Sequence, residues 1–279
     1  MKLVPDCYDC LKNLARQAAG LATQDPLLRQ RAIEEGIKIL DNDFSYDELS
    51  IVIATKIHGA IKEITGNPDP YRAMKERELS LAKTLYAKIK PQYRDDFKSD
   101  LRFAAVANAI DFFREPNIVR EDMRRPVNFA IDDSEQIEAR LKKGGRVLYL
   151  ADNIGEIYFD LPLFNWMKRF AHVTYVVKPL PVQNDASLDD IREAGLEDEF
   201  GSIMTTGVAS PGIVFALASE EFKQEFEAAD LIFAKGMGHY ESLSELPLQG
   251  KFFHCLMAKC RPVANSIGVP MNSYVAMLQ

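Results

Sequence analysis

Apolar residues in the first part of the chain recur every three or four positions, which is the spacing of one buried helix face. Leu11, Leu14 and Ala18 show this spacing near the start of the sequence. Similar stretches follow, and Pro91 ends one of them, because proline lacks the N–H donor that a helix interior needs. The pattern predicts an all-helical domain over residues 1–116.

The pattern changes after a predicted connector over residues 117–145, whose one helix ends at Gly144 and Gly145. Short apolar runs then alternate with helical stretches, as in parallel sheets covered by helices on both faces. Residues 146–279 are therefore predicted to form a three-layer α/β/α, Rossmann-like domain with a mainly parallel sheet. The predicted strands cover residues 146–150, 173–177, 202–205, 231–234 and 261–264, and the predicted helices between them cover 156–170, 187–194 and 212–228.

The composition narrows the classes of partner. The chain has 279 residues, of which 47% are hydrophobic and 27% charged, and its formal net charge is -7. This acidic balance argues against nucleic acid, because a phosphate backbone is bound by clustered lysine and arginine. No apolar run approaches the roughly 20 residues that span a bilayer, and the amino end lacks the apolar segment of a signal peptide. We therefore expect a cytoplasmic protein without a nucleic-acid or membrane partner.

Polar side chains gather where the predicted strands end, and parallel sheets bind their ligands beyond those ends. Asp152 and Asn153 follow the first strand directly, and Asp185 closes the loop after the second strand. Carboxylate and amide oxygens are ligands for hard cations such as Mg²⁺, and such a cation offsets the negative charge of a phosphate ester. Asp185 has a second interpretation, as the N-cap of the following helix.

The remaining strand ends suit an anion. Thr206 and Gly207 precede a predicted helix, whose free N–H groups would accept phosphate oxygens. Lys235 follows the fourth strand, where an ammonium group reaches an oxyanion. Glu156 either orients Asn153 or a metal-bound water, or is a first-turn acid favoured by the helix dipole. No GxGxxG or Walker A pattern follows a strand and no HExxH pattern is present, which argues against dinucleotide, nucleotide and imidazole-rich zinc sites.

The four cysteines are too few for a disulfide scaffold in a chain of this length. Cys7 and Cys10 stand one helical turn apart near a predicted helix start, which suits a metal pair, a redox pair or two buried thiols. A zinc site that also includes Cys255 and Cys260 is a further interpretation, although that second pair has poor spacing for one.

Three of these segments resemble the signatures of one protein family, in the same order. Residues 151–160, which begin Ala-Asp-Asn-Ile-Gly-Glu, are similar to its central signature, and residues 184–186 and 235–241 are similar to the next two. The family is the damage-control phosphatases, formerly catalogued as domain of unknown function eighty-nine. The resemblance covers nearly the whole chain, and the pair Cys7 and Cys10 is similar to that of the short stand-alone microbial members.

The resemblance implies a helical domain packed on an α/β/α domain and metal-dependent hydrolysis of small phosphorylated metabolites, such as sugar phosphates or damaged cofactor precursors. The cofactor would be a divalent ion of magnesium, manganese, cobalt or nickel. The resemblance implies that Asp152, Asn153 and Asp185 bind the metal and that Lys235 binds the substrate phosphate. It also implies that Asn108 and Asp111 reach the same cleft from the helical domain. His239 stands where the family often has asparagine, so the resemblance does not decide whether the side chain at this position contacts the site.

The catalytic step has two interpretations. Either Asp152 attacks phosphorus, or a metal-bound water does so, and we favour a direct role for Asp152 because the adjacent Asn153 ligates without competing as a base. A non-catalytic protein that binds metal and sugar phosphate is the alternative function. A carboxyl methyltransferase is a weaker alternative, because the first strand is not followed by a glycine-rich loop suited to the methyl donor.

Overall fold

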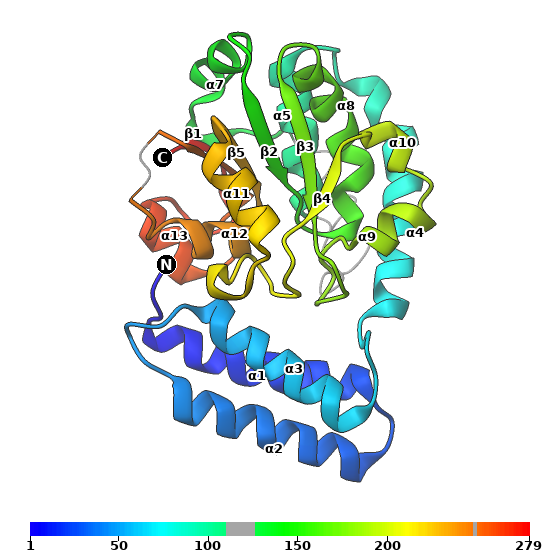
Figure 1. Ribbon diagram of the computed structural model, residues 1–279, viewed down its shortest axis with the longest axis vertical. Coiled ribbons are helices and arrows are strands. Elements are labelled where there is room, and N and C mark those ends of the chain that lie inside the picture. The colour runs from blue at the N-terminus through cyan, green and yellow to red at the C-terminus, as the bar shows by residue number, and fades with distance from the viewer. Residues whose placement is uncertain (110–125, 248–249) are drawn as a thin grey trace.

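The computed structural model describes residues 1–109, 126–247 and 250–279, and it places a small helical bundle beneath an α/β unit (Figure 1). The bundle consists of α1 (Pro5–Ala22), α2 (Pro26–Asp43) and α3 (Ser50–Thr65). Proline stands in the first turn of α1 and α2, and the Asp25 side chain caps α2 by accepting hydrogen bonds from the N–H groups of Leu27 and Leu28. The bundle has a hydrophobic core of its own, built on residues such as Leu11 and Ile57.

Two further helices lead from the bundle onto the sheet. They are α4 (Arg72–Ile89), extended by η1 (Lys90–Gln92), and α5 (Phe97–Val106), which runs into η2 (Ala107–Ala109). Leu85 and Phe103 belong to the same hydrophobic core as Tyr149 of the sheet. The predicted helical region is therefore confirmed, and its last two helices pack with the α/β unit instead of with the bundle.

One seven-stranded sheet forms the centre of the α/β unit, in the order β1-β7-β6-β5-β2-β3-β4. All neighbouring strands are parallel except β6 and β7, which are antiparallel. This mostly parallel sheet confirms the predicted fold class. The strands are β1 (Phe129–Asp132), β2 (Arg146–Leu150), β3 (His172–Val177), β4 (Ile203–Thr205), β5 (Leu231–Lys235), β6 (Phe252–Met257) and β7 (Tyr274–Leu278).

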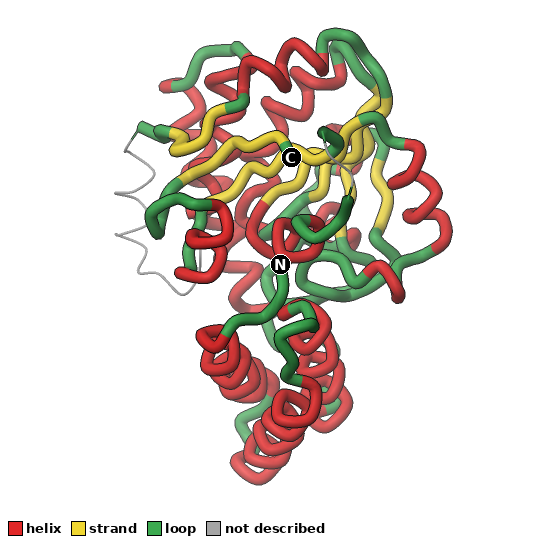
Figure 2. The backbone as a smooth tube through the Cα atoms, turned by 90° about the vertical axis from the view of Figure 1, so that its left-hand side faces the viewer, coloured by secondary structure: helices red, strands yellow, loops and turns green. Residues whose placement is uncertain are grey.

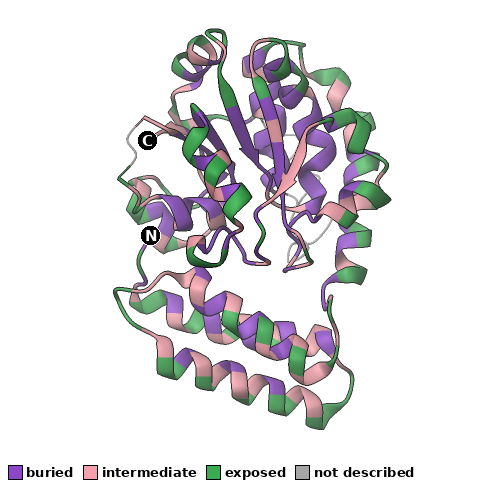
Figure 3. Ribbon diagram, viewed as in Figure 1, coloured by how far each residue is buried: buried purple, intermediate pink, exposed green. Residues whose placement is uncertain are grey.

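Helices cover both faces of this sheet (Figure 2). Alternate residues of β2 show why: Val147 and Tyr149 lie in the core with α8 (Ile157–Lys168), while Leu148 and Leu150 lie in the core with α11 (Glu220–Ala228). Strands that are buried on both faces read as unbroken apolar runs, and the central strands are buried along almost their whole length (Figure 3). The other helices of the unit are α7 (Ser134–Leu141), α9 (Leu188–Glu193), α10 (Glu197–Phe200), α12 (Gly236–Leu243) and α13 (Arg261–Ile267), with the short helices η3 (Ile154–Glu156) and η4 (Phe215–Leu217).

Several predicted elements differ from the observed ones. The strand predicted at residues 261–264 is wrong, because this segment is the start of α13, with Pro262 in its first turn. The helix predicted over residues 212–228 begins only at Glu220, where Ser219 provides the N-cap. Strands β1, β6 and β7 were not predicted, and β1 lies within the predicted connector. In the described ranges, no helix is both long and apolar enough to cross a bilayer.

Candidate active site

The loops after β2 and β3 are joined by their backbones at one edge of the sheet. Ala186 N–H donates to the Asp152 carbonyl at 2.8 Å, and Ile154 N–H donates to the Asn184 carbonyl at 2.8 Å. Asn153 and Asp185 form an antiparallel bridge between these two bonds. The structure therefore brings Asp152, Asn153 and Asp185 together. Asp185 does not cap the next helix, because Ser187 and Asp190 form the capping box of α9.

The Asp152 carboxylate is held by two asparagines. Its Oδ2 atom accepts a hydrogen bond from Asn108 Nδ2 at 2.9 Å and one from Asn153 Nδ2 at 3.0 Å. Burial and the nearby carboxylates of Glu156 and Asp185 raise the pKa of Asp152 well above its usual value. Gly236 has φ +76°, and a Cβ atom there would lie 2.0 Å from Asp152 Oδ2, so only glycine permits this close approach.

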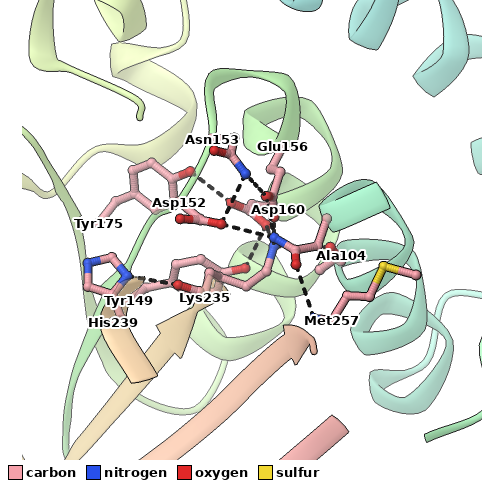
Figure 4. Close-up of polar contacts among 11 residues, drawn as sticks. Ala104, Tyr149, Asp152, Asn153, Glu156, Asp160, Tyr175, Lys235, His239 and Met257 are labelled. Carbon is pink, nitrogen blue, oxygen red and sulfur yellow. Dashed lines mark hydrogen bonds and ion pairs between the residues drawn. The ribbon is translucent and has the colours of Figure 1, made fainter. Parts of the chain in front are cut away.

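Glu156 connects the two asparagines to a buried lysine (Figure 4). Its Oε1 atom accepts hydrogen bonds from Asn108 Nδ2 at 2.7 Å and from Asn153 Nδ2 at 2.9 Å, and its Oε2 atom lies 2.6 Å from Lys235 Nζ. Burial acts to raise the pKa of Glu156, but the Lys235 ammonium outweighs it, so the pKa lies below its usual value. Glu156 thus orients Asn153, which is one of the two interpretations of its position in the sequence.

Lys235 is completely buried, and three protein oxygens surround its ammonium group. Nζ donates to the Ala104 carbonyl at 3.0 Å, to Glu156 Oε2 at 2.6 Å and to Asp160 Oδ1 at 2.8 Å. Burial acts to lower the pKa of Lys235, but the carboxylates of Asp160 and Glu156 raise it above its usual value. An ammonium has three N–H donors, so the predicted contact of Lys235 with a phosphate would require one of these bonds to break.

Asp160 completes this buried charge cluster, and sequence reasoning did not assign it a role. Its two oxygens accept hydrogen bonds from the hydroxyls of Tyr149 at 2.8 Å and Tyr175 at 2.9 Å. It stands four residues after Glu156, so the two carboxylates share one helix face. That spacing was the available signal in the sequence.

Two further lysines lie near the same carboxylates and were also missed. Lys178 follows β3, and its buried Nζ donates to the Gly212 carbonyl at 2.5 Å and lies 3.6 Å from Asp185 Oδ2. Burial raises the pKa of Asp185 to about 6, against the opposing effect of Lys178. Lys259 follows β6, and its charge lowers the pKa of both Asp152 and Glu156.

Asn108 occupies the place that the sequence predicts for a residue reaching in from the helical region. Besides its two bonds to carboxylates, its Oδ1 atom accepts a hydrogen bond from Met257 N–H at 3.0 Å. It therefore connects η2 and the end of β6 to the Asp152 loop. Asp111, the other predicted residue of this region, lies outside the described residues.

Thr206 and Gly207 have local roles in the loop after β4. The Thr206 hydroxyl donates to the Val208 carbonyl at 2.9 Å, and Gly207, at φ +73°, packs against Ser219. Neither residue makes a hydrogen bond to Asp152, Asn153 or Asp185 in the part of the chain that the structure describes. Because α11 begins only after Ser219, their N–H groups do not form a helix N-terminus.

Cys7, Cys10 and Cys260 line one cavity of about 510 Å³ between α1 and α13. Cys255 lies elsewhere, on β6, with its thiol close enough to Lys235 for that charge to affect its pKa. The four cysteines therefore do not form the single zinc site considered above, and all four thiols are free. Among the described residues, no three His, Cys, Asp or Glu side chains are grouped so that they could hold a metal ion by themselves.

Comparison with known proteins gives full-length matches. The profile of the "Damage-control phosphatase ARMT1-like domain" matches residues 3–275. The chain is 31% identical over 283 residues to "Damage-control phosphatase PH1575" of Pyrococcus horikoshii. This alignment covers 99% of this chain and 98% of that protein. It is 35% identical over 287 residues to a protein of Archaeoglobus fulgidus named "Damage-control phosphatase", with 99% of each chain covered.

The fold has a close counterpart among solved structures. The crystal structure of a DUF89 family protein from Pyrococcus horikoshii superposes with a TM-score of 0.91 at 31% sequence identity. The match covers 100% of this chain and 99% of that one. Both the helical bundle and the α/β unit are therefore parts of the shared fold.

Proposed function

Because this chain belongs to the damage-control phosphatase ARMT1-like family, we propose that it is a divalent-metal-dependent phosphatase of small phosphorylated metabolites. The observation that carries the proposal is the convergence of Asp152, Asn153 and Asp185 at the carboxyl ends of two adjacent parallel strands. Ligands of open α/β sheets bind at this edge.

The donor atoms of these three residues fit a hard divalent cation. Two carboxylates and an amide oxygen form the partial oxygen set that Mg²⁺ and Mn²⁺ take in proteins. Both N–H bonds of the Asn153 amide are directed at carboxylates, which leaves its Oδ1 atom as the atom that would ligate a cation (Figure 4). The crowding of buried carboxylates that raises the pKa of Asp152 is also relieved when positive charge binds beside it. A bound cation would neutralise charge on the phosphate ester and polarise its phosphoryl oxygens.

The protein side chains divide the remaining work. We assign the direct catalytic role to Asp152, since the neighbouring Asn153 cannot act as a competing base. Glu156 holds the Asn153 amide in place, and Lys235 keeps Glu156 ionised. Lys259 is the cation that we place against the substrate phosphate, because its charge acts on both Asp152 and Glu156 and its side chain is partly exposed.

Release of inorganic phosphate tests the proposal. Sugar phosphates and phosphorylated cofactor fragments would be incubated with the protein and Mg²⁺, Mn²⁺, Co²⁺ or Ni²⁺, and a chelator should abolish the release. Asp152→Asn should remove activity with no loss of fold by circular dichroism. Asp198→Asn, an exposed position on α10, is the matched control and should keep full activity. Metal binding without turnover of any substrate would refute the proposal in favour of a non-catalytic metal and sugar-phosphate binder.

A further inference from the structure

The helical bundle meets the α/β unit at the loop that carries Asp185. The two units have separate hydrophobic cores. Helix α3 nevertheless places two side chains against residues 181–183: Lys62 Nζ donates to the Pro181 carbonyl, and His58 Nε2 lies 3.1 Å from Gln183 Nε2. His58 and Lys62 are four residues apart and so lie on one face of α3. The bundle thus touches the polypeptide two residues before Asp185.

Gln183 has an unfavourable backbone conformation. Its φ is +46°, and Asn272 is the other non-glycine residue with positive φ in the described ranges. Gln183 lies in a tight turn that the Asp185 N–H closes onto the Val182 carbonyl at 3.1 Å. A side chain strains the backbone in this region, and such strain persists where surrounding contacts hold it.

His58 provides a contact suited to hold the turn. It is buried, and burial together with the Lys62 charge lowers its pKa to about 3. The imidazole is therefore neutral at physiological pH, and with its proton on Nδ1 the Nε2 lone pair accepts the Gln183 amide N–H. Tyr71 packs edge-on against the His58 ring at 5.8 Å and limits its rotation.

The other side of the turn is fixed by the α/β unit. Asn184 Nδ2 donates to the two carboxylate oxygens of Glu78 on α4, at 3.2 and 3.1 Å. The Asn184 carbonyl accepts the Ile154 N–H. The turn is therefore held between α3 on one side and α4 with the β2 loop on the other. Of the two residues of this loop that α3 contacts, Gln183 is the one that lies within the turn closed by Asp185.

We propose that His58 and Gln183 are positioning residues through which the helical bundle sets the place of the Asp185 carboxylate. This rests on the proposed role of Asp185 as a metal ligand. Residues that orient a metal ligand without touching the metal typically change metal affinity by about 10- to 100-fold when they are replaced.

Gln183→Asn tests the contact with little backbone change. Asparagine tolerates positive φ better than most residues, and its shorter side chain withdraws the amide from His58. We expect Mn²⁺ binding, measured by isothermal titration calorimetry on the metal-free protein, to weaken about tenfold while the melting temperature stays unchanged. His58→Phe should give the same loss, and the double variant should lose no more than either single variant, because both remove one interaction.

Thr55→Ala is the matched control on α3, since the Thr55 hydroxyl bonds within its own helix to the Ile51 carbonyl. Its Mn²⁺ affinity should equal that of the wild type. Wild-type protein that binds no Mn²⁺ would overturn the proposed metal site itself. If the wild type binds Mn²⁺ and the affinity of Gln183→Asn lies within twofold of the wild-type value, only the role of His58 and Gln183 is overturned. If His58→Phe does not fold, the Gln183→Asn measurement decides alone.

Discussion

Gly236→Ala is the substitution that most directly tests the geometry around Asp152. The added Cβ atom would lie 2.0 Å from Asp152 Oδ2, whereas ordinary contacts begin at 3.4 Å. The carboxylate must therefore move by about 1.4 Å or the turn must open. Gly236 also has φ +76°, where a side chain costs about 1–2 kcal/mol.

Gly195→Ala separates these two effects. Gly195 has φ +69°, but a Cβ atom there meets nothing within 4 Å. Each variant should therefore lose about 1–2 kcal/mol of unfolding free energy through backbone strain, and Gly236→Ala should lose about 1–3 kcal/mol more through its clash with Asp152. At about 2–4 °C per kcal/mol, the melting temperature should fall by a few degrees in Gly195→Ala and by more in Gly236→Ala.

The two variants should differ in catalysis. A displacement of about 1 Å at a reacting group can cost on the order of 100-fold in rate, so Gly236→Ala should lose at least that factor in phosphate release, while Gly195→Ala stays near wild type. Calorimetric melting and phosphate release on the same preparations provide both readouts. Equal activities of the two variants would show that phosphate release does not depend on the observed position of the Asp152 carboxylate.

Three other changes have expected outcomes. Lys235→Met leaves two buried carboxylates without their cation and should lower the free energy of unfolding in urea by about 3–5 kcal/mol. Lys98→Met, which breaks an exposed ion pair, should lower it by less than about 1 kcal/mol. Similar losses in the two variants would refute the stabilising role of Lys235 in the buried charge cluster. Burial lowers the pKa of His254 to about 4, so the unfolded chain binds its proton first as pH falls. His254 alone should therefore account for about 2 kcal/mol of the stability lost between pH 8 and pH 5. A His254→Phe variant with the same pH slope as the wild type would contradict this. Asn108→Ala removes both hydrogen bonds to Asp152 and Glu156 without adding charge, so Mn²⁺ affinity by calorimetry should fall about 10- to 100-fold. Unchanged affinity would exclude a role of Asn108 in holding these carboxylates.

The central strands were predictable because they are buried on both faces. Residues 147–150 and 231–234 are continuous apolar runs, and short runs of this kind are typical of strands in a parallel sheet that is covered on both faces. Strand β1 is only half-buried, and β7 depends on pairing with β1 and β6, which no local pattern encodes. Residues 261–264 were predicted as a strand, but the proline in this segment fits the first turn of a helix.

The convergence of three of the candidate site residues was also predictable. Asp152, Asn153 and Asp185 follow from the rule that strand ends form ligand sites, because β2 and β3 are neighbours. The three bonds of Lys235 were not predictable, since they depend on how deeply its side chain is buried and on α5 supplying the Ala104 carbonyl. Lys259 was missed because β6, which places it, was missed.

The position of β7 has a consequence for how the chain folds during synthesis. This strand is made after both β1 and β6, yet it lies between them in the sheet. Until residues 274–278 leave the ribosome, β1 and β6 each present an open row of backbone donors and acceptors. Such edges pair readily with other nascent chains. The gap between β1 and β6 is thus filled only when β7 emerges, and a ribosome that stalls between β6 and β7 holds an aggregation-prone intermediate.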